Sequence, residues 1–182
     1  MSDSRTHRRA RGTTGVALVA LVGALASASA RSTEPPQCAS AEFHQFDFWK
    51  GDWDAYDMAD TTRIVGRGQV TPMLGGCVLR EVYRQGDGLE GESYNLWNAK
   101  RELWHQSWVT NRGDLLLLDG MFEDGRMTLI ARESRLDGSS SLLRGVWWAE
   151  GRSVREKADR STDGGKTWTL VFDMVFRPHG RR

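Results

Sequence analysis

One alternating segment places a carboxylic acid among large apolar side chains. In residues 77–85 (CVLREVYRQ), Leu79, Glu81 and Tyr83 fall on every second position and therefore share one face of a strand. If that face points inward, burial would raise the pKa of Glu81, and the carboxyl could exchange protons near neutral pH. Glu81 is therefore our candidate catalytic residue, a general acid or base for isomerisation, cyclisation or hydrolysis of a small organic molecule.

Two further segments carry tryptophans in the same alternating pattern. Trp104, Gln106 and Trp108 share a face of one segment, and Ser93, Asn95 and Trp97 share a face of the other. Aromatic walls with a few amide and acid groups are typical of a small-molecule pocket. A packed core would use the same residues to fill volume, and alternation does not tell which face is inside, so both interpretations stay open. The predicted ligand-binding residues are Glu81, Tyr83, Asn95, Trp104, Gln106 and Trp108.

Metal and haem chemistry has little support in the sequence. Of the histidines after residue 30, only His105 lies within an alternating segment; it could ligate haem, but a hydrogen-bonded structural role is favoured. The acids Asp52, Asp54, Asp57 and Asp60 lack the spacing of a calcium loop and are expected on a solvated surface. Nucleophile-elbow, zinc-protease, phosphate-loop and dinucleotide motifs are absent from the sequence. We therefore expect no cofactor and no metal site.

The elements that would position these residues are short strands joined by tight turns. Turns rich in Gly, Asp and Asn recur every 8 to 12 residues or so from position 51 onward, and no stretch keeps a helical period. This pattern predicts an all-β, antiparallel up-and-down barrel of about ten strands, with a two-sheet sandwich as the alternative. The aromatic stretch 42–49 (EFHQFDFW) is expected to form a short helical turn or lid. The expected strands are 52–59, 63–71, 77–85, 92–98, 102–110, 115–122, 127–135, 142–149, 153–160 and 167–177.

One turn has a recognisable form. Residues 161–168 (STDGGKTW) match the Asp-box of sialidase-type propellers, S-x-D-x-G-x-T-W, but the motif occurs once in a chain of 182 residues, too short for a propeller. We interpret it as a stabilised hairpin turn rather than a glycan site.

Several of these segments together resemble a known family. The opening FDFWKGDWD at residues 46–54 is similar to the FDFWxGxWD motif of a family of small exported bacterial proteins, a domain of unknown function with a lipocalin-like, or calycin, barrel. Similar stretches follow at 75–81, 91–95, 104–109, 161–168 and 172–173. The resemblance implies a calycin barrel over 42–177 and places Glu81, Asn95, Trp104, Gln106 and Trp108 at motif positions. It carries no established activity, and the haem-proximal histidine pattern of the related nitrobindin barrels is not recognisable here.

The first thirty residues read as a secretory signal peptide. Four arginines precede an apolar run at 16–26, and Ala28-Ser29-Ala30 supplies small residues for cleavage after Ala30; Arg8-Arg9 leaves twin-arginine export open as an alternative to general secretion. The apolar run is too short for a stable membrane span. The remaining parts are expected to be a linker at 31–41, the barrel domain at 42–177 and a disordered tail at 178–182. We therefore expect a periplasmic or secreted protein.

Charge and cysteine content narrow the partners. Beyond the leader the chain carries 21 basic and 23 acidic residues without a basic cluster, which argues against nucleic acid. Cys38 and Cys77, bound for an oxidising compartment, are expected to form a disulfide bond, with a pair of reactive or metal-binding thiols as the alternative.

Three functions stay open at this point. The first is a barrel that binds a small apolar or aromatic ligand, and the second is a cofactor-independent enzyme that uses Glu81. The third is a structural barrel with no ligand. The oligomeric state does not follow from the sequence.

Overall fold

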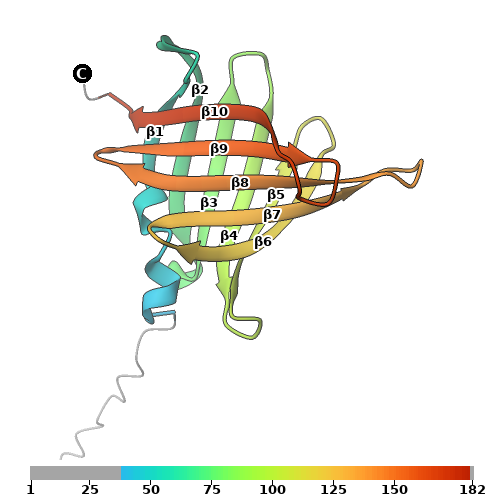
Figure 1. Ribbon diagram of the computed structural model, residues 1–182. Coiled ribbons are helices and arrows are strands. Elements are labelled where there is room, and N and C mark those ends of the chain that lie inside the picture. The colour runs from blue at the N-terminus through green and yellow to red at the C-terminus, as the bar shows by residue number, and fades with distance from the viewer. Residues whose placement is uncertain (1–37, 181–182) are drawn as a thin grey trace, which may run out of the picture. The chain divides into compact units, whose positions relative to one another are not determined.

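The chain folds into a closed barrel of ten antiparallel strands, each paired with its neighbours in sequence order, with β1 and β10 closing the ring (Figure 1). The structure is a computed structural model that describes residues 38–180. The expected signal peptide, most of the expected linker and the last two residues lie outside this range. Successive strands lie next to each other because every connection is a short turn.

The strand order follows the sequence, and each of the ten expected segments overlaps one observed strand. The expected all-β up-and-down barrel is confirmed, and the sandwich alternative is wrong. The largest difference is at the second strand, which extends beyond the expected 63–71 at both ends. The strands are β1 Gly51–Asp57, β2 Asp60–Met73, β3 Val78–Gln85, β4 Glu90–Asn98, β5 Leu103–Thr110, β6 Leu115–Glu123, β7 Arg126–Ser134, β8 Ser140–Glu150, β9 Ser153–Ser161 and β10 Thr169–Pro178.

The hairpin turns explain why the strands stop where they do. Between β6 and β7 the two turn residues Asp124 and Gly125 have φ values of 50° and 74°. Two consecutive positive φ values match the right-handed twist of the paired strands, and Asp-Gly tolerates them well. The residues 161–168 form the β9–β10 turn, in which Asp163 accepts hydrogen bonds from the backbone N–H and the hydroxyl of Thr167. The interpretation of this motif as a stabilised turn is confirmed.

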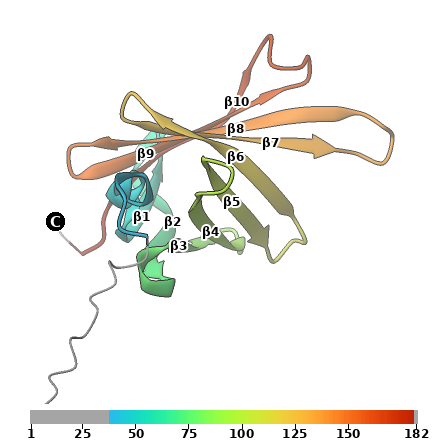
Figure 2. The ribbon, with the colours of Figure 1, turned by 90° about the horizontal axis from the view of Figure 1, so that it is seen from below.

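The N-terminal arm, residues 38–50, fills one end of the barrel. It forms two short 3₁₀ turns, η1 (Ala41–His44) and η2 (Asp47–Trp49), beside the start of β1 (Figures 1 and 2). Phe46 and Trp49 are fully buried, and their rings contact Trp104, Trp147 and Phe176 with centroid distances of 4.7–5.8 Å. The expected helical turn is confirmed, and it closes the barrel from within as part of the core.

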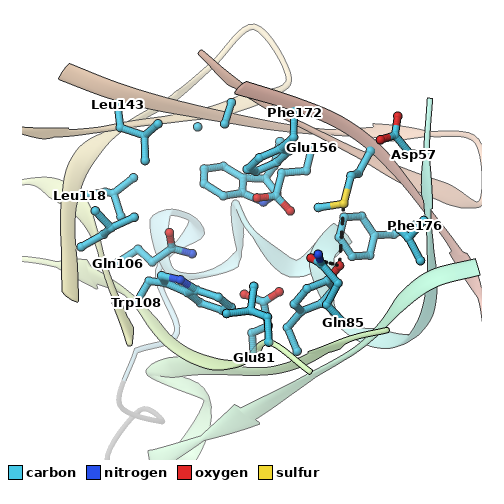
Figure 3. A pocket seen from close by; sticks show the side chains of 18 residues that line it. Asp57, Glu81, Gln85, Gln106, Trp108, Leu118, Leu143, Glu156, Phe172 and Phe176 are labelled. Carbon is cyan, nitrogen blue, oxygen red and sulfur yellow. Dashed lines mark hydrogen bonds between the residues drawn. The ribbon is translucent and has the colours of Figure 1, made fainter. Parts of the chain in front are cut away.

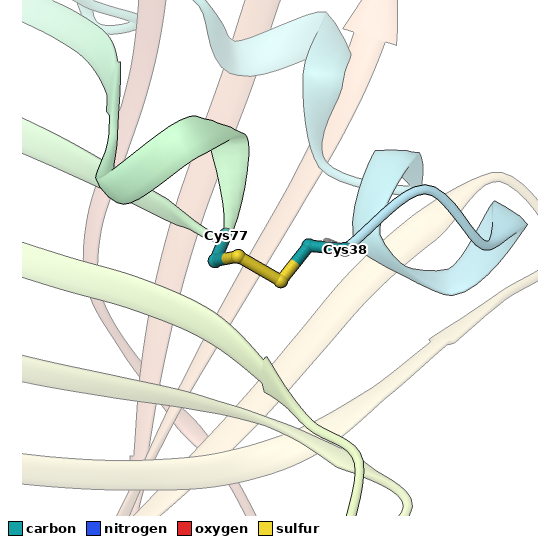
Figure 4. Close-up of a disulfide and its surroundings, with 2 residues drawn as sticks. All are labelled: Cys38 and Cys77. Atoms are coloured by element: carbon teal, nitrogen blue, oxygen red, sulfur yellow. A yellow bond between two sulfur atoms is a disulfide. The ribbon is translucent and has the colours of Figure 1, made fainter. Parts of the chain in front are cut away.

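A disulfide holds this arm against the barrel wall. Cys38 is bonded to Cys77, which directly follows the short turn η3 (Leu74–Gly76) between β2 and β3, and their Cα atoms are 5.2 Å apart (Figure 4). The expected disulfide is therefore confirmed, and the free-thiol alternative is wrong.

Two expectations about the surface need correction. Pro178 belongs to β10, and the backbone N–H of His179 donates to the Asp52 carbonyl oxygen, so these two residues of the expected tail are held by β1. Asp54, expected in solvent, is only 8% exposed, and its Oδ1 lies 2.9 Å from His179 Nδ1. The pairing of β10 with β1 brings His179 over Asp54 and covers it.

Candidate functional site

A cavity of about 440 Å³ occupies the barrel interior beyond the packed end (Figure 3). Its size falls within the range of ordinary ligand pockets. Most of its lining residues are apolar, with leucines and aromatic side chains making up half of them, and a few acids and amides complete the wall. The lining residues are Asp57, Val65, Glu81, Tyr83, Gln85, Leu89, Gln106, Trp108, Leu116, Leu118, Leu143, Gly145, Trp147, Glu156, Ala158, Phe172, Met174 and Phe176.

Glu81 of β3 is the most deeply placed acid of the cavity. Its side chain is only 6% exposed, and its Oε2 accepts a hydrogen bond of 2.9 Å from the Ser93 hydroxyl of β4. Its other oxygen, Oε1, accepts no hydrogen bond from residues 38–180, and the carboxyl points into the cavity (Figure 3). Burial raises the pKa of Glu81 from 4.5 to about 7, and the bond from Ser93 opposes this rise.

A chain of hydrogen-bonded amide and hydroxyl groups connects to Glu81 through Ser93. Gln106 Nε2 donates to Asn95 Oδ1, and Asn95 Nδ2 donates to the Ser93 hydroxyl, each over 2.8 Å. Asn95 Nδ2 also lies 3.2 Å from the Leu79 carbonyl oxygen. Because each side chain of this network is hydrogen-bonded to the next, the network holds the Ser93 hydroxyl, and with it Glu81, in one orientation.

A second acid faces Glu81 from the opposite wall. Glu156 of β9 projects into the cavity (Figure 3). Its cross-strand partner is Trp147 of β8, which also lines the cavity. Burial, followed by the negative charge of Glu81, raises the pKa of Glu156 well above its ordinary value, and a polar contact with Trp147 opposes the rise. The two carboxyls therefore interact, and each is protonated more readily than an isolated carboxyl would be.

Glycines keep the cavity open by letting aromatic rings lie flat on the wall. A Cβ added at Gly91 would lie 2.3 Å from the Trp108 ring, and one at Gly145 would lie 2.4 Å from the Trp147 ring. The hydrogen in place of a side chain therefore leaves the space that each indole occupies. Without these glycines the rings would be displaced from the wall toward the barrel axis.

Four of the six predicted ligand-binding residues line the cavity, namely Glu81, Tyr83, Gln106 and Trp108. The placement of the other two differs from the expectation. Asn95 is fully buried in the network beneath the cavity, and Trp104 is 1% exposed and donates from Nε1 to Gln45 Oε1 of the N-terminal arm. The barrel interior thus combines both sequence-based alternatives: a packed core at the end filled by the arm, and a cavity beyond it.

Sequence reasoning missed Glu156. The segment Val154–Glu156–Ala158 alternates with Arg155, Lys157 and Asp159, so the whole of β9 reads as a charged surface strand. The pattern that could have revealed Glu156 is the alternation itself: the apolar residues Val154 and Ala158 share its strand face, which indicates that this face is buried.

His105 lies on the outer wall and faces away from the cavity. Its Nδ1 is 2.8 Å from Asp119 Oδ1 and its Nε2 is 2.9 Å from the Ser107 hydroxyl. This Ser–His–Asp arrangement resembles a catalytic triad. However, Arg101 binds both oxygens of Asp119, and none of the three residues lines the cavity. The structural interpretation of His105 agrees with these contacts.

Within the described residues, no group of three or more His, Cys, Asp or Glu side chains is placed to hold a metal ion. No helix in that part of the chain has the length and apolarity to cross a membrane.

A scan against protein-family models matches none of them, and a search of curated proteins finds no match. The fold and the cavity therefore define the molecule as a ten-stranded antiparallel barrel with an acidic, aromatic-walled interior.

Proposed function

We propose that the protein binds a small, largely apolar molecule inside the barrel. The cavity of about 440 Å³, walled by Leu and aromatic side chains with a few inward polar groups, carries this proposal. A barrel built only as a scaffold gains nothing from an internal void, because unfilled space forfeits packing contacts. The cavity therefore counts against the structural alternative.

We further propose that the protein works outside the cytoplasm. The signal peptide expected at residues 1–30, with cleavage after Ala30, would export it. The Cys38–Cys77 disulfide supports an oxidising compartment such as the periplasm or the exterior. Membership of the calycin-like family with the FDFWxGxWD opening is likewise a proposal, supported by the motif and the barrel.

A cavity-filling variant tests the binding proposal. The probe is N-phenyl-1-naphthylamine, a neutral dye whose fluorescence rises in apolar surroundings. Leu116 of β6 lines the cavity, whereas the adjacent Leu117 is 54% exposed on the outer wall. Leu116→Trp should abolish dye binding, and the matched control Leu117→Trp should retain it, because alternate residues of a strand face opposite sides. Equal binding by both variants, or no binding by the unmodified protein, would contradict the proposal. Native mass spectrometry of the exported protein would show any ligand already bound.

An acid–base enzyme is the second candidate, and the facing pair Glu81 and Glu156 favours it. Two interacting carboxyls in an apolar cavity can hold one proton between them, so that one acts as acid while the other acts as base. For any compound that the protein converts, Glu81→Gln should abolish turnover while binding of that compound persists. Unchanged turnover in both Glu81→Gln and Glu156→Gln would exclude this mechanism.

A further inference from the structure

The charged groups of the cavity are all of one sign. Asp57, Glu81 and Glu156 line it, and no lysine, arginine or histidine does so within residues 38–180. Figure 3 shows Glu81 and Glu156 on facing sides, with Asp57 at the edge of the group of lining residues. An anionic ligand would therefore meet only repulsion, and a cation would be attracted by every charged group that it passes.

Glu81 adds a second, independent feature. Its side chain is 6% exposed, Ser93 donates to one of its oxygens, and the other oxygen accepts no hydrogen bond from the described residues. Such an oxygen is free to accept a hydrogen bond from a molecule that occupies the cavity. A ligand that brings N–H donors to this point finds an acceptor that no group of the described residues occupies.

The surrounding rings suit the same kind of ligand. Trp108, Trp147 and Phe172 line the cavity together with the two facing acids. Aromatic faces attract cations as well as apolar bodies, and the attraction strengthens where water is excluded. A bare metal ion would fit poorly, because the described residues offer it no cluster of three ligands and the walls are apolar.

We propose that the ligand is a protonated amine with an aromatic or other apolar body. Its ammonium group lies between Glu81 and Glu156 and donates to the open oxygen of Glu81, while its body packs against Trp108, Trp147 and Phe172. This inference rests on the proposed binding function and names the chemical class of its ligand.

Ligand binding is then coupled to proton release. The titratable groups that face the cavity are Asp57 of β1, Glu81 and Tyr83 of β3, and Glu156 of β9. Burial, followed by the charges of Glu156 and Glu81, raises the pKa of Tyr83, so the phenol stays neutral and takes no part. Because burial raises the pKa of both carboxyls, they keep protons at a higher pH than exposed acids do, and an arriving ammonium displaces such a proton to solvent. One positive charge thus replaces another between the two acids.

Matched probes distinguish this inference from the proposed function. The affinities of 1-naphthylmethylamine and of its neutral counterpart 1-naphthalenemethanol are measured by titration calorimetry at pH 8 and pH 5.5. At pH 8 the amine should bind at least about tenfold more tightly than the alcohol, as expected of a buried charge pair. That preference should shrink at pH 5.5, which lies below the raised pKa of Glu81. Near pH 7, calorimetry in buffers of different ionisation enthalpy should show a net release of protons on amine binding.

Isosteric variants complete the experiment. The double variant Glu81→Gln/Glu156→Gln should bind both probes alike, and Glu123→Gln, at an exposed site at the end of β6, should keep the amine preference. Equal affinities for amine and alcohol in the unmodified protein would overturn the amine inference and leave the binding function standing. Binding of neither probe would overturn both proposals.

Discussion

Replacing Glu81 with glutamine should stabilise the folded protein at alkaline pH and leave its stability nearly unchanged at acidic pH. Glutamine has the shape of the protonated glutamic acid and keeps an oxygen to accept the bond from Ser93. It removes only the charge that burial disfavours. The effect should therefore appear only where the original carboxyl is ionised.

The magnitude follows from the shift in pKa. Burial raises the pKa of Glu81 from 4.5 to about 7, so the folded state binds the proton more tightly than the unfolded state. The contribution of the protonated Glu81 carboxyl to the unfolding free energy is fully present below pH 4.5 and is lost as pH rises through about 7. A shift of this size corresponds to about 3 kcal/mol of unfolding free energy, or roughly 10 °C in Tm for a domain of this length. The raised pKa of Glu156 adds a loss in the same direction.

Urea unfolding followed by tryptophan fluorescence at pH 4.5 to 8.5, with the disulfide intact, measures this difference. The unmodified protein should lose stability across the range, Glu81→Gln should lose less, and Glu81→Gln/Glu156→Gln should change least. Glu123→Gln, at an exposed position, serves as the control and should follow the unmodified protein. If Glu81→Gln loses stability with pH as steeply as the unmodified protein does, Glu81 is not a buried, destabilised carboxylate and the reasoning is wrong.

Two further predictions concern the parts that shape the cavity. Replacing both Cys38 and Cys77 with serine removes a disulfide between residues that are 39 positions apart in the chain. The unfolding free energy measured in urea titrations should fall by about 4 kcal/mol. A loss below about 1 kcal/mol would show that the N-terminal arm stays in place without the disulfide. Gly145→Ala would force the Trp147 ring off the wall, since the new Cβ would lie 2.4 Å from it, and should cost about 1–3 kcal/mol and weaken dye binding. Gly68→Ala is the matched control, because its Cβ would lie 3.7 Å from Phe176 in ordinary contact, and equal effects of the two variants would refute the role of Gly145.

Much of the barrel could be predicted because its signals are local. Alternation of apolar and polar residues marks a strand, and the turn residues between strands mark hairpins, so the order and approximate bounds of all ten strands follow from short stretches of sequence. The shared face of Glu81 and Tyr83, or of Gln106 and Trp108, follows from the same period of two. That these faces point inward is a property of the closed ring.

Only the tertiary structure decided the depth of each residue and the groups that face it across the barrel. Trp104 shares a strand face with Trp108, yet it lies in the packed end because the N-terminal arm inserts Phe46 against it. Glu156 faces Glu81 because the ring brings β9 opposite β3, two strands that share no hydrogen bond and lie far apart in the chain. The sequence by itself thus determined the strands and the disulfide-forming cysteines. The carboxyl pair depends on contacts across the interior, which no local pattern encodes.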